Sequence, residues 1–373
     1  MSPKAFLEAR VAAGDLPGAA WVVARGRQVL AGGAVGAARA VPPRRPADEG
    51  TVYDLASLTK PLATAVLAVL LARDGVVGLD GPVGDHLPEL GSSPYARATL
   101  LDLLVHRCGL PAWEPLYLHG SDPPSYLRRL ARLPPAGPPG GPAVYSDLGY
   151  LAAGILLERA SGHSLETLFR TRILDSLPGP APEVCFLPPP AWRPRIAPTE
   201  RGSRHDREMT ASLAGEAAAR DYRGWRHALI EGEVHDQNAW VAGGVCGHAG
   251  LFGTAAGVAR LGAEFLAGSR LFTSGELDLF QTSRIDPGPP RRSLGFEVGG
   301  EAAGRVVSPR TFGQVGFTGT SLFVDPSTQG VYVLLANRVH PEHREIAMKA
   351  LRSGFHDRAA RRLGPVPDPT ALE

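Results

Sequence analysis

A serine and a lysine three residues apart, Ser57 and Lys60, can together cleave an ester or an amide. Three residues along a helix bring two side chains to one face, with a rise of about 4.5 Å. An amine within reach of a serine hydroxyl can take up the hydroxyl proton and so make the serine a nucleophile. The pair therefore predicts acyl transfer through an acyl-enzyme on Ser57.

The surroundings of this pair distinguish it from the solvated Ser-x-x-Lys pairs that are common on helices. The flanking residues are mostly apolar, and Lys60 is one of only three lysines in the chain. An ammonium beside an apolar core is costly unless it is paired or neutral. We therefore expect Lys60 to have a depressed pKa, as a general base requires.

Pro61 fixes where the helix that carries the pair begins. Proline costs little only in the first helical turn, so the helix must start at about Ala56 to Leu58, with Ser57 at its N-terminus. The free N–H of Ser57 and the helix dipole would stabilise a developing oxyanion there. The apolar stretch 61–72 is too short to span a bilayer and is typical of a core helix.

Two further segments carry residues suited to the same chemistry. Tyr145-Ser146-Asp147 follows a Pro/Gly-rich loop and precedes a helical pattern, which predicts a turn with Asp147 at an N-cap position. Residues 313–320 form a Gly-rich stretch that we expect to be a strand. Either segment alone is also compatible with a purely structural role.

Taken in order along the chain, the segments resemble the three motifs of serine β-lactamases and penicillin-binding proteins. The Tyr form of the second motif is similar to class C β-lactamases and to the carboxylesterases and D-aminopeptidases related to them. Five segments carry the resemblance: Ser57-x-x-Lys60, Leu103–Pro111, Tyr145–Asp147, Gly247–Phe252 and Gly313–Thr320.

The resemblance implies a role for each matched residue. Tyr145 would shuttle the proton with Lys60, and Asp147 would orient Lys60. The backbone N–H groups of Ser57 and Phe317 would form the oxyanion hole. We expect neither a cofactor nor a metal.

The third motif departs from the family pattern, since Gln314-Val315-Gly316 stands where Lys-Thr-Gly or His-Thr-Gly is usual. Glutamine has no charge and valine cannot form a hydrogen bond. We expect these three residues to contact the substrate and to favour small neutral esters or amides over substrates with a carboxylate. Recognition of a carboxylate would need an arginine, for which Arg338 and Arg344 are candidates.

The sequence leaves two possible roles for the histidines in the matched segments. His248 and His106 either line the cleft, where His248 would bind substrate, or are structural hydrogen-bonding groups. Residues His235–Asn238 form either a binding loop or a simple turn.

Composition excludes several other classes of protein. The 39 basic and 37 acidic residues give a net charge of +2 without long runs of one sign, so nothing indicates a nucleic-acid partner. Three distant cysteines argue against a disulfide framework or a metal cluster. Residues 1–18 lack the apolar core of a secretory signal, so we expect a cytoplasmic protein without a membrane partner. The oligomeric state stays open.

The coarse element pattern predicts an α/β (α+β) fold. Strands at 19–24 and 28–35 form a hairpin, and strands at 321–324 and 330–336 precede a helix over 341–363. The middle of the chain has short helical patterns, at 100–105, 124–132, 148–161 and 164–172, and no convincing strand.

This pattern implies an antiparallel sheet built from both chain ends, flanked by helices, with a mostly helical insertion. The predicted domains are residues 1–75 with 240–373, and residues 76–239. We expect the active site in the cleft between them.

Three functions fit the sequence. The first is a serine esterase or amidase that takes a small-molecule ester, amide or β-lactam. The second is a β-lactamase, D,D-peptidase or D-aminopeptidase. The third is an inactive member of the fold that binds a partner, since both side chains of the third motif are replaced. A metal-dependent hydrolase is disfavoured, because no cluster with ligand spacing is present.

Overall fold

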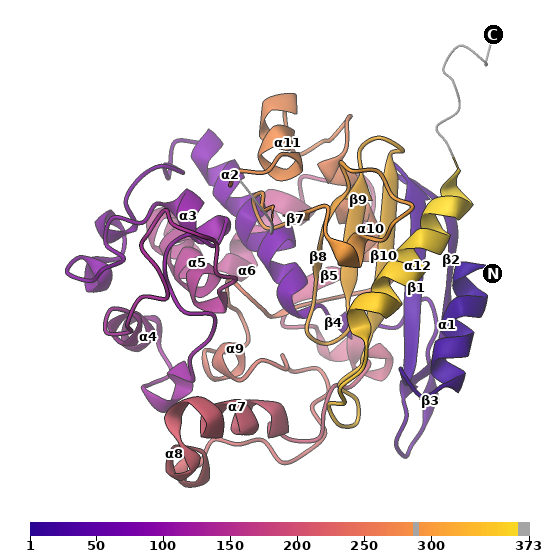
Figure 1. Cartoon of the computed structure of the whole chain (residues 1–373), viewed down its shortest axis with the longest axis horizontal. Coiled ribbons are helices and arrows are strands. Elements are labelled where there is room, and N and C mark those ends of the chain that lie inside the picture. The colour runs from indigo at the N-terminus through magenta and orange to yellow at the C-terminus, as the bar shows by residue number, and fades with distance from the viewer. Residues whose placement is uncertain (286–290, 365–373) are drawn as a thin grey trace.

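The two ends of the chain form one antiparallel sheet (Figure 1). The computed structural model describes residues 1–285 and 291–364. Within these residues the sheet has seven strands, in the spatial order β3 (Arg45–Pro46), β2 (Gln28–Arg39), β1 (Gly18–Arg25), β10 (Gly330–Ala336), β9 (Ser321–Asp325), β8 (Phe312–Val315) and β7 (Glu297–Val298). The predicted fold class, an antiparallel sheet from both chain ends flanked by helices, is confirmed.

The central strands β1 and β10 are buried along almost their whole length because helices cover both faces of the sheet. Helices α1 (Pro3–Ala12) and α12 (Met348–Leu363) cover one face, where the rings of Trp21 and Phe355 meet edge to face at 6.2 Å. Helix α10 (Ala255–Gly262) packs on the other face. Strands buried on both faces have continuous apolar sequences, in agreement with the apolar runs that predict them.

A second, three-stranded sheet connects the middle of the chain to the segment that carries Ser57. Its strand order is β4 (Tyr53–Asp54), β6 (Leu251–Gly253) and β5 (Val184–Phe186). The expectation that the middle has no strand is wrong, because β5 pairs with β6. Three residues between Pro-rich loops are too few to show an alternating pattern.

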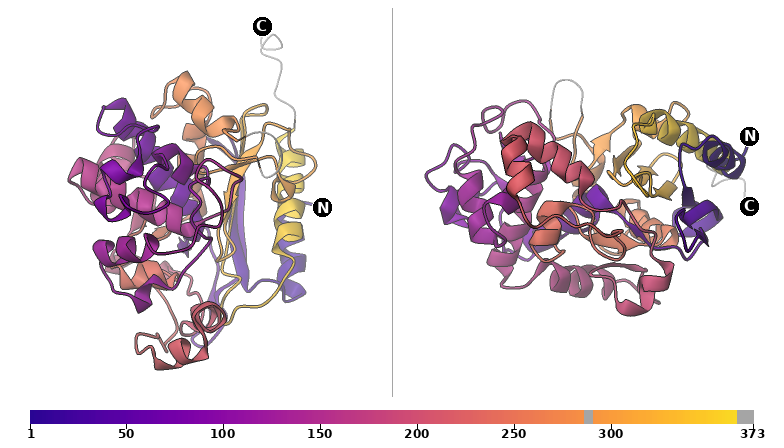
Figure 2. Two further views of the ribbon diagram at one scale, coloured as in Figure 1. Left: turned by 60° about the vertical axis from the view of Figure 1, so that its left-hand side comes forward. Right: turned by 90° about the horizontal axis from the view of Figure 1, so that it is seen from below.

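Helices form most of the middle of the chain and lie on the opposite side of the molecule from α1 and α12 (Figures 1 and 2). The predicted helical patterns correspond to α3 (Leu100–Leu104), α4 (Pro123–Leu130), α5 (Asp147–Ser161), and α6 (Leu165–Leu168) with the π-helical turn Phe169–Leu174. Helices that the sequence pattern did not predict are α7 (Arg204–Ala214), α8 (Glu216–Asp221), α9 (Gln237–Val241), α10 and α11 (Ser274–Gln281).

Helix α12 begins at Met348, so the expected start at Pro341 is wrong. The segment before Met348 is fixed by contacts with the middle of the chain. The carbonyl of Pro341 accepts a hydrogen bond from the N–H of Arg201 at 2.8 Å. The imidazole of His340 lies between the carbonyl of Thr199 and the N–H of Ala40. These tertiary contacts take the place of a helical turn.

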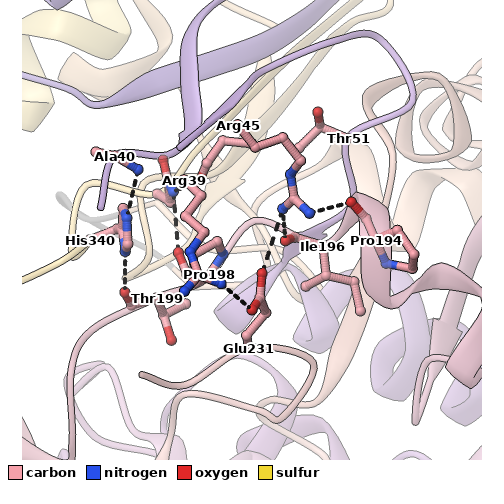
Figure 3. A network of polar contacts seen from close by, with 12 residues as sticks. Arg39, Ala40, Arg45, Thr51, Pro194, Ile196, Pro198, Thr199, Glu231 and His340 are labelled. Carbon is pink, nitrogen blue, oxygen red and sulfur yellow. Dashed lines mark hydrogen bonds and ion pairs between the residues drawn. The ribbon is translucent and has the colours of Figure 1, made fainter. Parts of the chain in front are cut away.

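Glu231 and two arginines connect the N-terminal hairpin to the middle of the chain (Figure 3). Arg39 and Arg45 lie 2.9 Å and 3.6 Å from the Glu231 carboxylate. Arg45 also donates to the carbonyls of Pro194 and Ile196. The network holds the hairpin against the segments that enclose the cavity described below.

The helical stretch Ala56–Arg73 has the length and hydropathy of a membrane-crossing helix, but 83% of it is buried inside the protein. It comprises a 3-10 turn (Ala56–Leu58), a π-helical turn (Lys60–Ala65) and α2 (Val66–Arg73). This burial is that of a core helix. The predicted domain boundaries, residues 1–75 with 240–373 and residues 76–239, stay a prediction.

Candidate active site

A cavity of about 200 Å³ opens beside Ser57, at the start of this helical stretch. Its walls combine carboxylates, imidazoles and apolar side chains: Asp54, Ala56, Ser57, Trp113, Asp147, His205, Asp206, Met209, Val234, His235, Asp236, His248, Ala249 and Phe317. They come from both chain ends and from the middle of the chain.

The chain enters the Ser57 turn from β4 through a left-handed residue, Ala56, with φ 48°. The Asp54 carboxylate fixes this turn by accepting hydrogen bonds from the N–H groups of Ala56 at 2.8 Å and His235 at 2.7 Å. A non-glycine residue with positive φ is strained, and such strain is concentrated at functional sites. Pro61 lies in the first turn of the π-helical segment that follows, in agreement with the predicted helix start.

Lys60 is fully buried and lies between two oxygens of the candidate site. Its Nζ donates to the Ser57 Oγ at 2.8 Å and lies 2.7 Å from the Asp147 Oδ1. It also donates to the carbonyl of His248 at 3.4 Å. The structure therefore brings together the serine, the lysine and the aspartate that the sequence singled out.

The expected depression of the Lys60 pKa is wrong. Burial acts to lower the pKa of Lys60, but the neighbouring Asp147 and Tyr145 outweigh burial and raise it. The sequence around Lys60 shows only its apolar neighbours along the helix, whereas Asp147 belongs to another helix, α5. A lysine whose pKa is raised is an ammonium group at neutral pH.

Tyr145 lies against Lys60, with its ring centroid 5.0 Å from the Lys60 Nζ. The Gln314 Nε2 donates a hydrogen bond to the Tyr145 Oη at 2.8 Å. The guanidinium of Arg292 lies 5.1 Å from the same ring centroid. Gln314 therefore forms a direct hydrogen bond with Tyr145, and Arg292 places a positive charge near the Tyr145 ring.

The sequence reasoning missed Arg292 and proposed two other arginines in its place. Arg338 stacks on the Phe317 ring at 4.7 Å and donates to the Phe317 carbonyl, and Arg344 is exposed. Arg292 lies in no recognisable motif, so no signal in the sequence could have found it.

Asp147 is the first residue of α5, and Ser146 is its N-cap, so the expected N-cap position of Asp147 is wrong by one residue. The Ser146 Oγ accepts a hydrogen bond from the Gly149 N–H at 3.1 Å and donates to the Pro111 carbonyl at 2.6 Å. The cap leaves the Asp147 carboxylate free to face Lys60.

His106 positions this turn and is structural. Its Nδ1 accepts a hydrogen bond from the Ser146 N–H at 3.0 Å, and its ring lies 4.5 Å from that of Tyr145. Burial, with Arg292 and Lys60 nearby, holds the pKa of His106 well below its usual range. A neutral imidazole is required for this acceptor role.

Strand β8 ends in a turn that is docked onto the Ser57 segment. A Cβ on Gly316 would lie 2.1 Å from the Thr320 Oγ1 and 2.7 Å from the Leu55 carbonyl oxygen, so only glycine fits. The Thr318 and Thr320 hydroxyls donate to the carbonyls of Asp54 and Leu55. Gly316 thus allows the close approach of the two segments.

Phe317 follows this glycine, and its ring is enclosed by three imidazoles, those of His205, His235 and His343, at 4.5 to 5.5 Å. Among residues 1–285 and 291–364, neither the Phe317 N–H nor the Ser57 N–H has a hydrogen-bond partner. Both are available for the oxyanion that the sequence predicts.

Val315 is not among the cavity-lining residues. It is half-buried, pairs with Ser321 in the sheet, and packs against the apolar cluster beneath α12. Its predicted contact with substrate stays a prediction.

His248 contributes its carbonyl to Lys60 and its ring to Asp236, with the Nε2 3.0 Å from the Asp236 Oδ1. Its loop is packed tightly on α5, because a Cβ on Gly247 would lie 2.0 Å from the Tyr150 carbonyl oxygen. His248 also lines the cavity. In the described part of the chain, no group of three His, Cys, Asp or Glu residues has the arrangement of a metal site.

Comparison with known families gives the same grouping as these motifs. The family described as Beta-lactamase matches residues 4–354 of the chain. The chain belongs to the β-lactamase family. It is therefore a serine hydrolase, as the sequence predicts.

Relatives within and around the β-lactamase family differ in their named activities. An Escherichia coli (strain K12) protein named "Putative D-alanyl-D-alanine carboxypeptidase" is 30% identical in an alignment of 323 residues that covers 79% of this chain and 70% of that protein. A class C β-lactamase from Rhodobacter sphaeroides superposes with a TM-score of 0.73 at 19% identity, over 97% of this chain and 99% of that one.

A third similar protein is EstCE1, described as a hydrolase with promiscuous acyltransferase activity. Its TM-score is 0.72 at 18% identity, over 96% of this chain and 97% of that one. At these identities, the two solved structures show a shared fold.

Proposed function

We propose that this member of the β-lactamase family hydrolyses small esters or amides through an acyl-enzyme on Ser57, and that its substrates lack a carboxylate beside the scissile bond. The observation that carries the proposal is the position of Lys60, 2.8 Å from the Ser57 Oγ and 2.7 Å from the Asp147 Oδ1. The replacement of the third-motif cation by Gln314 supports the limit on substrates.

In the proposed mechanism, Tyr145 acts in its phenolate form: the Ser57 Oγ attacks the substrate carbonyl carbon, and the Ser57 proton passes to the phenolate oxygen of Tyr145. Lys60, as an ammonium group, and the Gln314 amide stabilise negative charge on the oxygens of the site. The Ser57 and Phe317 N–H groups would hold the oxyanion. Tyr145 returns the proton to the leaving group, and water repeats the sequence to release the acid.

The test is mass-spectrometric detection of acylation at Ser57 after incubation with a panel of p-nitrophenyl esters, amides and β-lactams. We expect an acyl adduct on Ser57 and a loss of ester turnover of at least a thousandfold in Ser57→Ala. Unchanged turnover in Ser57→Ala would refute the assignment of the nucleophile.

A second candidate is D-alanyl-D-alanine carboxypeptidase or β-lactamase activity. It is favoured by the named activity of the E. coli relative. It is also favoured by Arg292, which lies beside Tyr145 and could form an ion pair with a carboxylate on the substrate. Turnover of nitrocefin or labelling of Ser57 by penicillin in preference to neutral esters would establish it.

The remaining alternative, an inactive member of the fold, is separated from both by a fluorophosphonate probe. Labelling of the folded protein, absent in Ser57→Ala, excludes it. A folded but unlabelled protein would support it and contradict the proposed hydrolysis.

A further inference from the structure

Four carboxylates line the cavity beside Ser57, and three of them have partners. Asp54 accepts two backbone hydrogen bonds, Asp147 pairs with Lys60, and Asp236 contacts His248 and caps α9. The fourth is Asp206, in the first turn of α7. Within the described ranges, its carboxylate has no hydrogen bond and no ion pair, and its Oδ2 is buried.

Asp206 is only 4% exposed, so water does little to solvate its charge. Burial first, and Asp236 second, raise the pKa of Asp206 to about 7. A buried carboxylate without a partner is costly, so its presence needs an explanation, of which a bound ligand or a catalytic role is one.

The cations near Asp206 are engaged elsewhere. Arg226 directs its guanidinium N–H groups to the Ser203 Oγ and to the carbonyls of Val234 and His235. His235 lies 3.3 Å from the Glu200 carboxylate. Burial lowers the pKa of His205, the histidine beside Asp206 on α7, to about 4, so it is neutral.

The rest of the cavity wall suits a small organic cation. No lysine or arginine is among its lining residues, and Trp113, Met209 and Val234 supply apolar and aromatic surface. A primary ammonium donates three hydrogen bonds, whereas a carboxylate only accepts them. At about 200 Å³ the cavity is smaller than drug-sized sites, which fits a ligand of the size of an amino-acid amide.

We propose that this cavity selects esters and amides that bear a free primary ammonium group, which Asp206 holds while Ser57 attacks the carbonyl carbon of the same molecule. Small amino-acid esters, amides and peptides have this chemistry. The inference rests on the proposed function of Ser57, and it extends the expectation of uncharged substrates to cationic ones.

The first test compares alanine p-nitroanilide with its N-acetyl derivative, as both enantiomers, at pH 7.5. The measured quantity is the ratio of kcat/KM for the free amine to that for the acetylated substrate. We expect a ratio above ten in the wild type and a fall of at least tenfold in Asp206→Asn. The matched control is Glu208→Gln on the exposed face of the same helix, which should keep the wild-type ratio.

A second test measures the ammonium site without catalysis. Calorimetry with alaninamide and N-acetylalaninamide on Ser57→Ala should show preferential binding of the free amine. Adding Asp206→Asn to this variant should abolish the preference. Above pH 7, where Asp206 is ionised, the preference should be larger than at pH 6.

These tests separate the two levels of the proposal. If esters acylate Ser57 but neither the kinetic nor the binding preference for the amine depends on Asp206, the ammonium site is refuted and the hydrolase remains. If no substrate acylates Ser57, the proposed function fails and the calorimetric result alone decides the ammonium site. A preference for a carboxylate-bearing ligand that is lost in Asp206→Asn would instead make Asp206 a protonated donor and overturn the inference.

Discussion

The protonation state of Lys60 is set by the groups that flank it. Burial alone favours a neutral amine, but Asp147 and Tyr145 reverse that preference. A lysine that stays charged is a poor base and a good electrostatic partner for negative charge on the Ser57 and Tyr145 oxygens. The residue that accepts the serine proton is therefore Tyr145 in the proposed mechanism.

Replacing Asp147 tests this view of Lys60. In Asp147→Asn the carboxylate charge is lost, so burial dominates and the pKa of Lys60 falls. If activity needs the ammonium form, it disappears as pH rises through that pKa. We expect a loss in kcat/KM of at least tenfold and a basic limb of the pH profile that moves to lower pH.

Ester turnover from pH 6 to 11 measures this shift. Asp175→Asn, an exposed aspartate on the surface, is the control and should leave the profile unchanged. An unshifted basic limb in Asp147→Asn would contradict the role given to Lys60.

A cation at position 314 would change which substrates acylate Ser57. Gln314→Lys restores the cation that the family usually has at this position, beside the Tyr145 hydroxyl. A charge-assisted hydrogen bond to a substrate carboxylate contributes about 1.5–3 kcal/mol, so we expect acylation by penicillin to rise at least tenfold relative to a neutral ester.

Competition between the two substrates for Ser57, followed by mass spectrometry, gives this ratio. Gln28→Lys on the exposed part of β2 should not change it. An unaltered ratio in Gln314→Lys would mean that this position does not contact the acyl group.

At the scale of elements, the active-site geometry depends on how closely β8 approaches the Ser57 turn. In Gly316→Ala the added Cβ would lie 2.1 Å from the Thr320 Oγ1, so the two segments must separate. A displacement of about 1 Å at a reacting group costs on the order of a hundredfold in rate. We expect a loss of that size in ester turnover, together with a lower Tm.

Gly275→Ala is the matched control, because a Cβ there meets nothing within 4 Å inside α11. It should leave turnover unchanged and stabilise the protein by about 0.5–1 kcal/mol. Normal turnover in Gly316→Ala would show that the turn can adjust without moving the Phe317 N–H.

Elements with long apolar runs or caps could be predicted from the sequence, and those fixed by tertiary contacts could not. Strands β1, β9 and β10 and helix α5 carry their own signals along the chain. Strand β5 and the start of α12 do not, because partners distant in sequence decide them. The same division applies within the site.

Within the site, the place of Ser57 at the start of the helix could be predicted from Pro61, because the start of a helix depends on nearby residues. The charge of Lys60, the contact of Arg292 with Tyr145 and the burial of the Asp206 carboxylate depend on residues from other elements. Charge and partnership are properties of the assembled fold, so spacing along one segment could not reveal them.

For the whole molecule, pH acts through buried histidines that stay neutral in the fold. His356 is fully buried between sheet and helix, where it donates to the Ala302 carbonyl and accepts from the Ser321 hydroxyl. Burial lowers the pKa of His356 to about 4. In the unfolded chain the His356 imidazole therefore binds a proton at about pH 6.5, whereas in the folded protein it does so only at about pH 4.

This difference removes stability as pH falls through that window. The His356 contribution is present above about pH 6.5, and on the order of 2–3 kcal/mol of it is lost by pH 4.5. Asp206 has a raised pKa, so its contribution to stability increases as pH falls and opposes that of His356. The effect of His356 is therefore measured by comparing a His356 variant with the wild type. We expect His356→Gln to lose less stability than the wild type between pH 7 and pH 4.5 in urea unfolding. If the wild type and His356→Gln lose equal stability between pH 7 and pH 4.5, His356 is not the source of the pH dependence.

The pairing of β1 with β10 has a consequence for the order in which the protein is made. The first hairpin is synthesised before the middle of the chain, whereas β10, its partner strand in the sheet, is synthesised after the middle of the chain. Gln314 and Phe317 emerge just before β10, long after Ser57. A nascent chain thus carries Ser57, Lys60 and Tyr145 before Gln314 and Phe317 are made, so the proposed chemistry begins only after β8 and the turn that follows it have been synthesised.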